Sequence, residues 1–390
     1  MNNLPFKAAD ILLPKANFEK WSCVACDQFT SQPDYWEKAY AIAGDATSAL
    51  NIVLPEIYLE DDVEKRIADI NENMVKYIDG GVFEEYKNAL IYVERTLPDG
   101  SVRRGLVGAI DLEAYDFTAG AKPMIRPTEG TVLERIPPRV KIRKDAPLEL
   151  PHVMLLIDDE KRTVIENLTS CDLPVVYDFD LMMGGGHIKG YLVDESMQKQ
   201  VFDALCLLVD GKDDPFLFAV GDGNHSLATA KVCHENSKTE LSRYALCELV
   251  NIHDESLVFE PIYRVMFGVD EMELISGLKE IFLGGDTPVE VITKNSSETF
   301  YTNGFPVGAL QDYLDTYLKN HPEAKIDYIH GEDVTRNLAS KDGCVGFIFG
   351  GMQKSELFPI VSERGVLPRK SFSMGEAASK RYYLEARKIK

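Results

Sequence analysis

The sequence has no run of 18 or more apolar residues, which excludes a conventional membrane-spanning helix. Its first residues, MNNLPFKAADILLPK, lack the basic start and the apolar stretch that a secretory signal needs. Seven cysteines, odd in number and scattered along the chain, argue against a disulfide framework. These absences predict a cytoplasmic protein that neither crosses nor binds a membrane.

Positive charge is also scarce. The chain has 42 Lys and Arg against 63 Asp and Glu, a formal net charge of −21. Duplex nucleic acid is bound mainly by neutralising its phosphates, so this balance argues against nucleic acid as a partner. A local positive pocket can still bind a small anion. We therefore expect a small anionic metabolite or a nucleotide.

The 390 residues exceed one ordinary core, and alternating patterns predict an α/β to α+β fold. The first 50 residues show neither the helical nor the strand spacing of apolar residues, so we expect them to be irregular. Pro98-Asp99-Gly100 between two strand-like runs predicts a β-hairpin. We expect a main domain over residues 1–267 with a mixed sheet, and a smaller α+β domain over residues 268–390. Apolar spacing further predicts helices over 54–80, 195–211, 271–282 and 307–319, and strands over 152–159, 173–180, 215–220, 288–293, 325–329 and 344–349.

The stretch FLFAVGDGNHSLATAK, residues 216–231, joins a strand to a helix through a glycine turn. The first N–H groups of such a helix have no partner inside the helix, and together with the positive end of the helix dipole they favour an anion. Gly221 and Gly223 allow positive φ and close approach of a ligand to the backbone. Asp222, Asn224 and Ser226 are common capping types, and His225 adds a titratable group.

Other interpretations of the turn remain open. Glycine with Asp, Asn and Ser is also ordinary turn and cap chemistry, although that does not explain His225. The turn is not a Walker A loop, because G-x-x-x-x-G-K-[S/T] is absent. GNH also occurs in metallophosphoesterases, but the chain lacks the D-x-H that their two-metal site needs.

GDGNHS and the small-residue helix after it resemble the D-G-H-H-R turn of the DUF1015 family. Four more segments are similar to parts of that family: FKAADILLP near the start, IRPTEGT…ER at 125–135, LVNIHDESLVFEPIYR at 249–264, and LPRKSFSMG at 367–375. The resemblance covers nearly the whole chain. It implies a family and no function, because the family is uncharacterised.

The turn alone resembles the G-G-C-H-R turn of sulfiredoxin and the D-G-H-H-R turn of ParB-like free-serine kinases. In those proteins the turn holds nucleotide phosphates at a helix start, so the resemblance implies a nucleotide-dependent phosphotransferase. It carries over to Asp222, Gly223, Asn224 and His225. It fails at Ser226, where those families have an arginine that would add a bidentate charge. Either another cation replaces that arginine, or the ligand is less charged, or the activity differs.

Several residues are candidates for the missing cation, although each could also be a solvated surface charge. Arg126 and Arg135 lie in a basic loop, and Arg264 lies in EPIYR. Lys370 is next to Ser371 in LPRKS, and we expect this C-terminal loop to return to the site. The candidate phosphate-binding side chains are Arg126, Arg135, Arg264, Lys370 and Ser371.

Phosphoryl transfer also needs charge neutralisation and a base or a metal. Asp222 is the first candidate for holding Mg²⁺ or acting as base, and Glu129 is the next. Asp254, beside His253, is a weaker candidate; all three could be cap or turn residues. The cofactor expected is ATP or ADP with Mg²⁺, and the sequence names no metal site.

Three further segments have weaker signals. Cys23-x-x-Cys26 suggests zinc or redox chemistry, but no further zinc ligands stand out, and buried thiols are the simpler interpretation. Asp27 and Gln28 follow in an aperiodic polar and aromatic segment, which is typical of a substrate-facing loop or of an N-terminal hook around the domain. Residues 184–186, three glycines before His187, predict a flexible loop.

Our leading hypothesis is an enzyme that transfers a phosphoryl group to or from a small metabolite, with Asp222, His225 and Glu129 in the chemistry. The alternative is a non-catalytic module that senses an anion or metabolite. A DNA-binding relative of ParB conflicts with the acidic charge.

Overall fold

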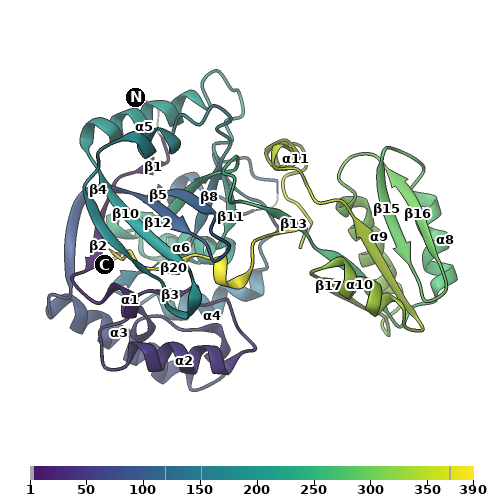
Figure 1. Cartoon of the computed structure of the whole chain (residues 1–390), viewed down its shortest axis with the longest axis horizontal. Coiled ribbons are helices and arrows are strands. Elements are labelled where there is room, and N and C mark those ends of the chain that lie inside the picture. Colours follow the sequence, from purple (N-terminus) through teal and green to yellow (C-terminus); the bar gives the residue numbers. More distant parts are fainter. Residues whose placement is uncertain (1–3, 119, 151, 369) are drawn as a thin grey trace. The chain divides into compact units, whose positions relative to one another are not determined.

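The structure, a computed structural model, describes residues 4–118, 120–150, 152–368 and 370–390. It forms two compact units (Figure 1). The first comprises the chain up to Leu257 together with Glu376–Lys390, and the second is Val258–Gly375. This division differs from the expected 1–267 and 268–390, because the last residues return to the first unit. There they pair as strands β20, Tyr382–Tyr383, with β3, Cys23–Val24, and β21, Arg387–Lys388, with β7, Leu148–Glu149.

Within the described residues of the first unit, ten strands form one mixed sheet, in agreement with the expected fold class. The strand order is β6-β11-β8-β12-β5-β4-β10-β9, with β1 paired to β5 and β2 to β4. Pairs β11–β6 and β12–β8 are parallel, and the other pairs are antiparallel. The strands are β1 Phe6–Lys7, β2 Ala9–Pro14, β4 Phe83–Thr96, β5 Val102–Asp111, β6 Ile125–Pro127, β8 Met154–Ile157, β9 Val175–Asp180, β10 His187–Val193, β11 Phe218–Asp222 and β12 Tyr244–Asn251.

The expected hairpin is confirmed as β4 and β5, which pair from Thr96 opposite Val102. Gly100 takes φ +86°, and the Asp99 carboxylate accepts the Ser101 amide at 2.9 Å. Alternate residues of β4 face opposite sides, so Leu90 and Tyr92 enter one apolar core while Ile91 and Val93 enter the other. The sheet is therefore buried on both faces, as mixed α/β sheets usually are.

Helices cover both faces of this sheet (Figure 1). The first 50 residues, expected to be irregular, include in their described part, from residue 4 on, the helices α1 and α2 and the strands β1, β2 and β3. The second helix begins with Pro33, whose fixed φ suits a first helical position. The helices of this unit are α1 Phe18–Trp21, α2 Pro33–Ala43, α3 Val63–Asp79, α4 Ile136–Arg143, α5 Glu195–Leu207, α6 Asn224–Ser237 and α7 Glu240–Arg243.

The second unit has a five-stranded antiparallel sheet in the order β16-β15-β18-β14-β17 within its described residues, and a two-stranded sheet of β13 and β19. Its elements are β13 Phe259–Pro261, β14 Tyr263–Phe267, α8 Glu271–Ile281, β15 Thr287–Ile292, β16 Ser297–Thr302, α9 Val307–Asn320, β17 Lys325–Ile329, α10 Glu332–Ala339, β18 Cys344–Phe349, α11 Leu357–Arg364 and β19 Phe372–Met374. Apolar residues of α8 and α9 pack on the larger sheet in one core, so the unit is α+β as expected.

Candidate functional site

The glycine turn lies between β11 and α6, where the sequence predicts it. Gly221 ends up inside β11, and Gly223 is the residue before the helix, with φ +78° and ψ 24°. A Cβ atom on Gly223 would lie 2.9 Å from the Cα atom of Val153. Both the left-handed backbone and this close approach therefore require glycine at 223.

The start of α6 presents three backbone donors. Leu227 is the first residue whose amide bonds back along the helix, to the Gly223 carbonyl at 2.9 Å. Gly223 offers no side-chain cap. Among the residues that the structure describes, none accepts a hydrogen bond from the amides of Asn224, His225 or Ser226, and none hydrogen-bonds the Ser226 hydroxyl. These amides and the positive end of the helix dipole thus form an anion-binding geometry.

Asn224 fastens the turn to the loop after β6. Its side-chain amide donates to the Glu129 carbonyl and to Thr131 Oγ1, both at 3.1 Å, and its carbonyl oxygen accepts the Tyr115 hydroxyl at 3.1 Å. Because β6 and β11 are parallel neighbours, their carboxyl ends meet at one edge. Glu129 therefore lies beside the turn, and Asn224 acts there as a structural link.

Asp222 is held from two directions. Its Oδ1 accepts the Gly223 amide at 2.8 Å, and its Oδ2 lies 3.2 Å from the Nζ atom of Lys380. Both side chains are mostly buried, with 21 % and 17 % exposed. Lys380 lies beside the turn, and the sequence reasoning missed it, since nothing local in SKRYYLEARKIK sets it apart from a surface lysine.

His225 is a neutral imidazole at physiological pH. Burial, helped by the charges of Arg139 and Arg135, lowers the pKa of His225 to about 4. Its Nε2 accepts the Val132 amide at 3.2 Å, so the ring proton is assigned to Nδ1. Arg135 is exposed, and Arg139 pairs with Glu56. The expected candidate Arg135 thus contributes positive charge near the turn.

Asp27 lies in the same region. Burial alone would raise the pKa of Asp27, but His152, Gln28 and Lys380 together lower it. His152 Nε2 is 3.8 Å from the Asp27 carboxylate, and His152 Nδ1 is 3.0 Å from the Tyr383 hydroxyl. Asp27 is therefore an ionised, mostly buried carboxylate near Lys380. The polar, aromatic segment after Cys26 is the signal that pointed to it.

The remaining expected cations have partners of their own. Arg126 is 2 % exposed, donates to the Pro123 carbonyl and pairs with Asp214 at 2.5 Å. Arg264 is fully buried in the second unit, where it donates to Gln311 at 3.2 Å and to the Ile262 carbonyl. These contacts explain both arginines as structural residues.

The loop of Lys370 and Ser371 also belongs to the second unit. Ser371 is buried and donates to the Pro368 carbonyl at 2.6 Å, and Lys370 is exposed. A C-terminal segment does return to the first unit, but it begins at Glu376 and its lysine at the turn is Lys380. Asp254, the weaker acid candidate, is buried and accepts the Arg104 amide at 3.1 Å.

The Cys23-x-x-Cys26 pair is buried, and burial raises the pKa of both thiols well above the usual range. A protonated thiol is a poor nucleophile and a poor metal ligand. In the described part of the chain, no group of three or more His, Cys, Asp or Glu side chains could hold a metal ion. A Mg²⁺ ion at the turn would therefore need phosphate oxygens to complete its coordination.

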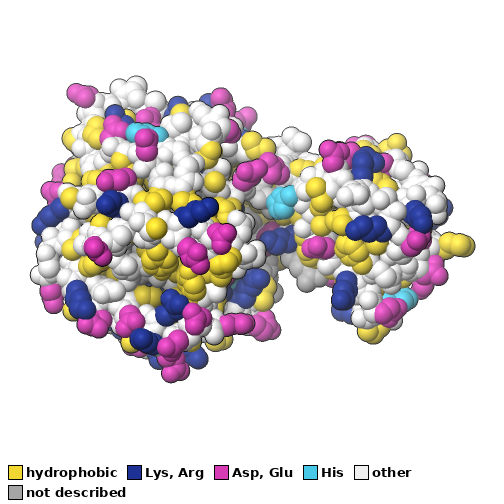
Figure 2. Space-filling view, turned by 60° about the horizontal axis from the view of Figure 1, so that its bottom comes forward, with side chains coloured by type: hydrophobic (Ala, Val, Ile, Leu, Met, Phe, Trp, Pro, Cys, Tyr) yellow, Lys and Arg dark blue, Asp and Glu magenta, His cyan; other side chains and the backbone are white. Residues whose placement is uncertain are grey.

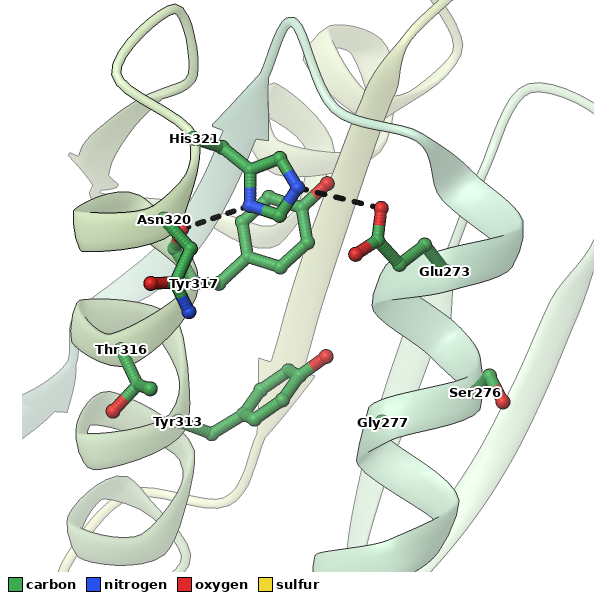
Figure 3. A pocket seen from close by; sticks show the side chains of 8 residues that line it. All are labelled: Glu273, Ser276, Gly277, Tyr313, Thr316, Tyr317, Asn320 and His321. Atoms are coloured by element: carbon green, nitrogen blue, oxygen red, sulfur yellow. Dashed lines mark hydrogen bonds and ion pairs between the residues drawn. The ribbon is translucent and has the colours of Figure 1, made fainter.

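A groove between α8 and α9 has a volume of about 390 Å³ (Figure 3). His321 stacks on Tyr317 with ring centroids 4.0 Å apart, and its Nε2 lies 3.4 Å from Glu273. The Tyr313 hydroxyl donates to the Leu274 carbonyl at 2.8 Å. The polar groups of His321, Glu273 and Tyr313 thus bond within the protein.

A family model described as "Protein of unknown function (DUF1015)" matches residues 4–384. The chain belongs to the DUF1015 family. This confirms the family that the five sequence segments indicated. No curated protein matches the chain, and none of the helices that the structure describes is long and apolar enough to cross a membrane.

Solved structures similar to this DUF1015 protein are distant. A free serine kinase variant in complex with ADP is 12 % identical, covers 75 % of this chain and 95 % of its own, and has a TM-score of 0.41. A conserved hypothetical protein from Pyrococcus furiosus is 13 % identical over 71 % of this chain and 90 % of its own, with a TM-score of 0.36. A C-terminally truncated SbnI from Staphylococcus aureus is 8 % identical over 69 % and 83 %, with a TM-score of 0.38. Likeness this low decides neither the activity nor the ligand.

Proposed function

We propose that the turn from Gly221 to Ser226 binds the phosphate of a small phosphorylated metabolite or nucleotide, and that the protein transfers a phosphoryl group to or from a small metabolite. The observation that carries this proposal is the set of three partnerless amides at the start of α6 in the described structure. A phosphate would accept hydrogen bonds from donors that otherwise depend on water.

The charges around the turn support a small anion. Lys380 is within ion-pair distance of Asp222, and Arg135 and Arg139 are close enough to depress the pKa of His225. Lysine and arginine side chains are spread among acidic ones over the face seen in Figure 2. A few cations beside one turn, in a chain of net charge −21, suit a metabolite or nucleotide better than a nucleic acid.

The carboxylates supply the remaining chemistry. Asp222 would hold a Mg²⁺ ion carried by a nucleotide, because Mg²⁺ commonly binds one or two carboxylates and completes its shell with phosphate oxygens and water. Asp27 or Glu129 takes the proton of an acceptor hydroxyl, and the lowered pKa of Asp27 makes it a weaker base than an ordinary aspartate. Neutral His225 donates a hydrogen bond from its Nδ1–H group to the bound ligand.

A non-catalytic anion-sensing module is the second candidate. It is favoured by the contacts of Asn224 and His225, whose side chains already bond Thr131, Glu129 and Val132 within the protein. Such contacts fix the shape of a binding site without providing a group that reacts.

Calorimetric titration with ADP and ATP, each with and without Mg²⁺, tests binding. The resemblance of the turn to that of ParB-like free-serine kinases makes adenine nucleotides the first probes. Phosphorus NMR of ATP with pooled hydroxyl-bearing metabolites tests transfer. We expect saturable binding and appearance of a phosphorylated metabolite. Binding without turnover, with His225→Ala losing affinity only, would favour the sensing module, and no binding of either nucleotide would overturn the proposal.

A further inference from the structure

The C-terminal segment that carries Lys380 is clamped through its backbone by two buried arginines of the central hairpin. Arg95 Nη1 donates to the Lys380 carbonyl at 2.5 Å, and its Nη2 donates to the carbonyls of Ala378 and Gly185, both at 2.9 Å. Arg103 Nη1 donates to the Ser379 carbonyl at 3.1 Å. Three consecutive carbonyls, 378 to 380, are therefore fixed by side chains that are 2 % and 4 % exposed.

The residues that follow Lys380 anchor the segment further. Arg381 contacts Glu248 at 3.0 Å and Glu385 at 2.7 Å, and all three side chains are buried. The Tyr382 ring lies under the Arg95 guanidinium, and its hydroxyl donates to the Met182 carbonyl at 3.2 Å. The clamp thus holds the segment on both sides of Lys380.

The three-glycine run at 184–186 belongs to the same arrangement. A Cβ atom on Gly185 would lie 2.4 Å from the Tyr382 hydroxyl oxygen, and one on Gly186 would lie 2.1 Å from the Thr96 carbonyl oxygen. Close packing accounts for Gly185 and Gly186, and the flexible loop expected from the sequence stays a prediction. Gly185 leaves room for Tyr382 of the segment that carries Lys380, whereas the Cβ position of Gly184 is in open space.

Burying Arg95 and Arg103 to fasten a chain end is costly, whereas Arg381 is compensated by Glu248 and Glu385. Burial lowers the pKa of Arg95 to about 9 and also lowers that of Arg103. Each buried ion loses much of its hydration free energy, and apolar side chains would anchor a tail at lower cost. The Nε atoms of Arg95 and Arg103 are also buried without a partner in the described structure. An arrangement that costs this much hydration indicates that the position of the segment is important for function.

We propose that Lys380 is the cation that binds the ligand's phosphate at the turn, and that Arg95 and Arg103 are positioning residues that fix its backbone. This inference rests on the proposed function. Lys380 supplies the charge that the turn lacks at Ser226. An ammonium group has three donors, so one can bond Asp222 while two remain for phosphate oxygens. The clamp removes backbone freedom that Lys380 would otherwise lose on binding.

Calorimetric titration with ADP tests the role of Lys380. In Lys380→Met we expect the Kd to rise about tenfold or more, the usual loss for a charge-assisted hydrogen bond. Lys380→Arg should restore most of the affinity. Lys388→Met is the matched control, because Lys388 is on the same segment and pairs with Glu85 at 3.5 Å. It should bind like the wild type.

The outcomes separate the two proposals. If the wild type binds ADP and Lys380→Met binds equally well, the inference is overturned and the proposed function stands. If Lys388→Met loses as much affinity as Lys380→Met, the effect belongs to the segment as a whole and the inference also fails. If the wild type binds neither ADP nor ATP, the proposed function fails and the inference with it.

A double-mutant cycle tests the positioning residues. Arg95→Lys keeps the charge but cannot reach all three carbonyls, so we expect it to weaken ADP binding. Combining it with Lys380→Met should cause little further loss, because both changes remove the same interaction. Arg103→Lys gives a second cycle if Arg95→Lys does not fold. Additive losses in the cycle that folds would overturn the positioning role.

Discussion

The Nζ atom of Lys380 lies 3.2 Å from Oδ2 of Asp222, although the two residues come from distant parts of the chain. The C-terminal segment reaches Asp222 because β20 and β21 pair with strands of the first unit. A carboxylate and an ammonium group thereby meet beside the free amides of α6. This pair links the end of the chain to the proposed phosphate site.

Gly223→Ala should destabilise the first unit and abolish ADP binding. Alanine must adopt φ +78°, and its Cβ would press on the Val153 backbone. We expect a loss of about 2–3 kcal/mol in the free energy of unfolding. Gly211→Ala is the control, because Gly211 has φ +71° but open space around its Cβ position. It should cost only about 1 kcal/mol. Equal losses, measured by chemical denaturation, would show that the Val153 contact is unimportant.

His225 should titrate far below other histidines. Its pKa of about 4 in the folded protein is below the unfolded value of about 6.5. The unfolded chain therefore binds more protons between these pH values, and the wild type loses stability as pH falls through this window. The His225→Gln variant should lose less stability than the wild type over the same pH range. Bound ADP should raise the pKa of His225, because phosphate favours the imidazolium. NMR of the imidazole Cε1 signal measures both, and a pKa near 6.5 in the free protein would refute the buried, neutral ring.

His187 should have the opposite pH dependence. Its Nδ1 lies 2.7 Å from Asp180 and its Nε2 2.8 Å from Asp178, and these hydrogen bonds raise the pKa of His187. A raised folded pKa stabilises the protein below the unfolded pKa of about 6.5, and this is lost as pH rises through the folded pKa. His187→Gln should therefore lower the melting temperature at pH 5.5 and matter less at pH 9. A loss that grows with pH would exclude the charged cluster.

Arg264→Met should destabilise the second unit and leave ADP binding unchanged. The substitution leaves Gln311 and the Ile262 carbonyl without their buried donor, which we expect to cost about 3 kcal/mol. Arg336→Met is the control in the same unit, since Arg336 pairs with Glu290 at a partly exposed position. It should cost much less stability than Arg264→Met, because exposed ion pairs contribute little. Thermal unfolding and an ADP titration measure both effects. Loss of ADP binding in a stable Arg264→Met protein would show that Arg264 takes part in phosphate binding.

Local signals in the sequence predict much of the fold. Pro98-Asp99-Gly100 determines its hairpin through turn chemistry within a few residues. The strand, glycine turn and helix around Gly223 follow from the same local rules. Apolar spacing likewise predicts α3, although its helix is shorter than the expected range 54–80.

Long-range contacts set the limit of prediction for the site. Asp222, Asn224 and His225 are neighbours in sequence, so their grouping follows from the turn. Lys380 reaches Asp222 only through strand pairing across the first unit, and no spacing rule encodes that contact. The sequence does not predict the burial of Arg264 either, because a charged side chain in a strand is expected to be solvated when its neighbours are unknown.

Amide NMR spectra of the isotope-labelled protein during an ADP titration test the central claim most directly. Binding at the turn predicts large, saturable shifts of the Asn224, His225 and Ser226 amides, whose donors would acquire phosphate acceptors. If ADP binds while these three signals stay in place, or if ADP causes no shifts at all, the turn is not the phosphate site.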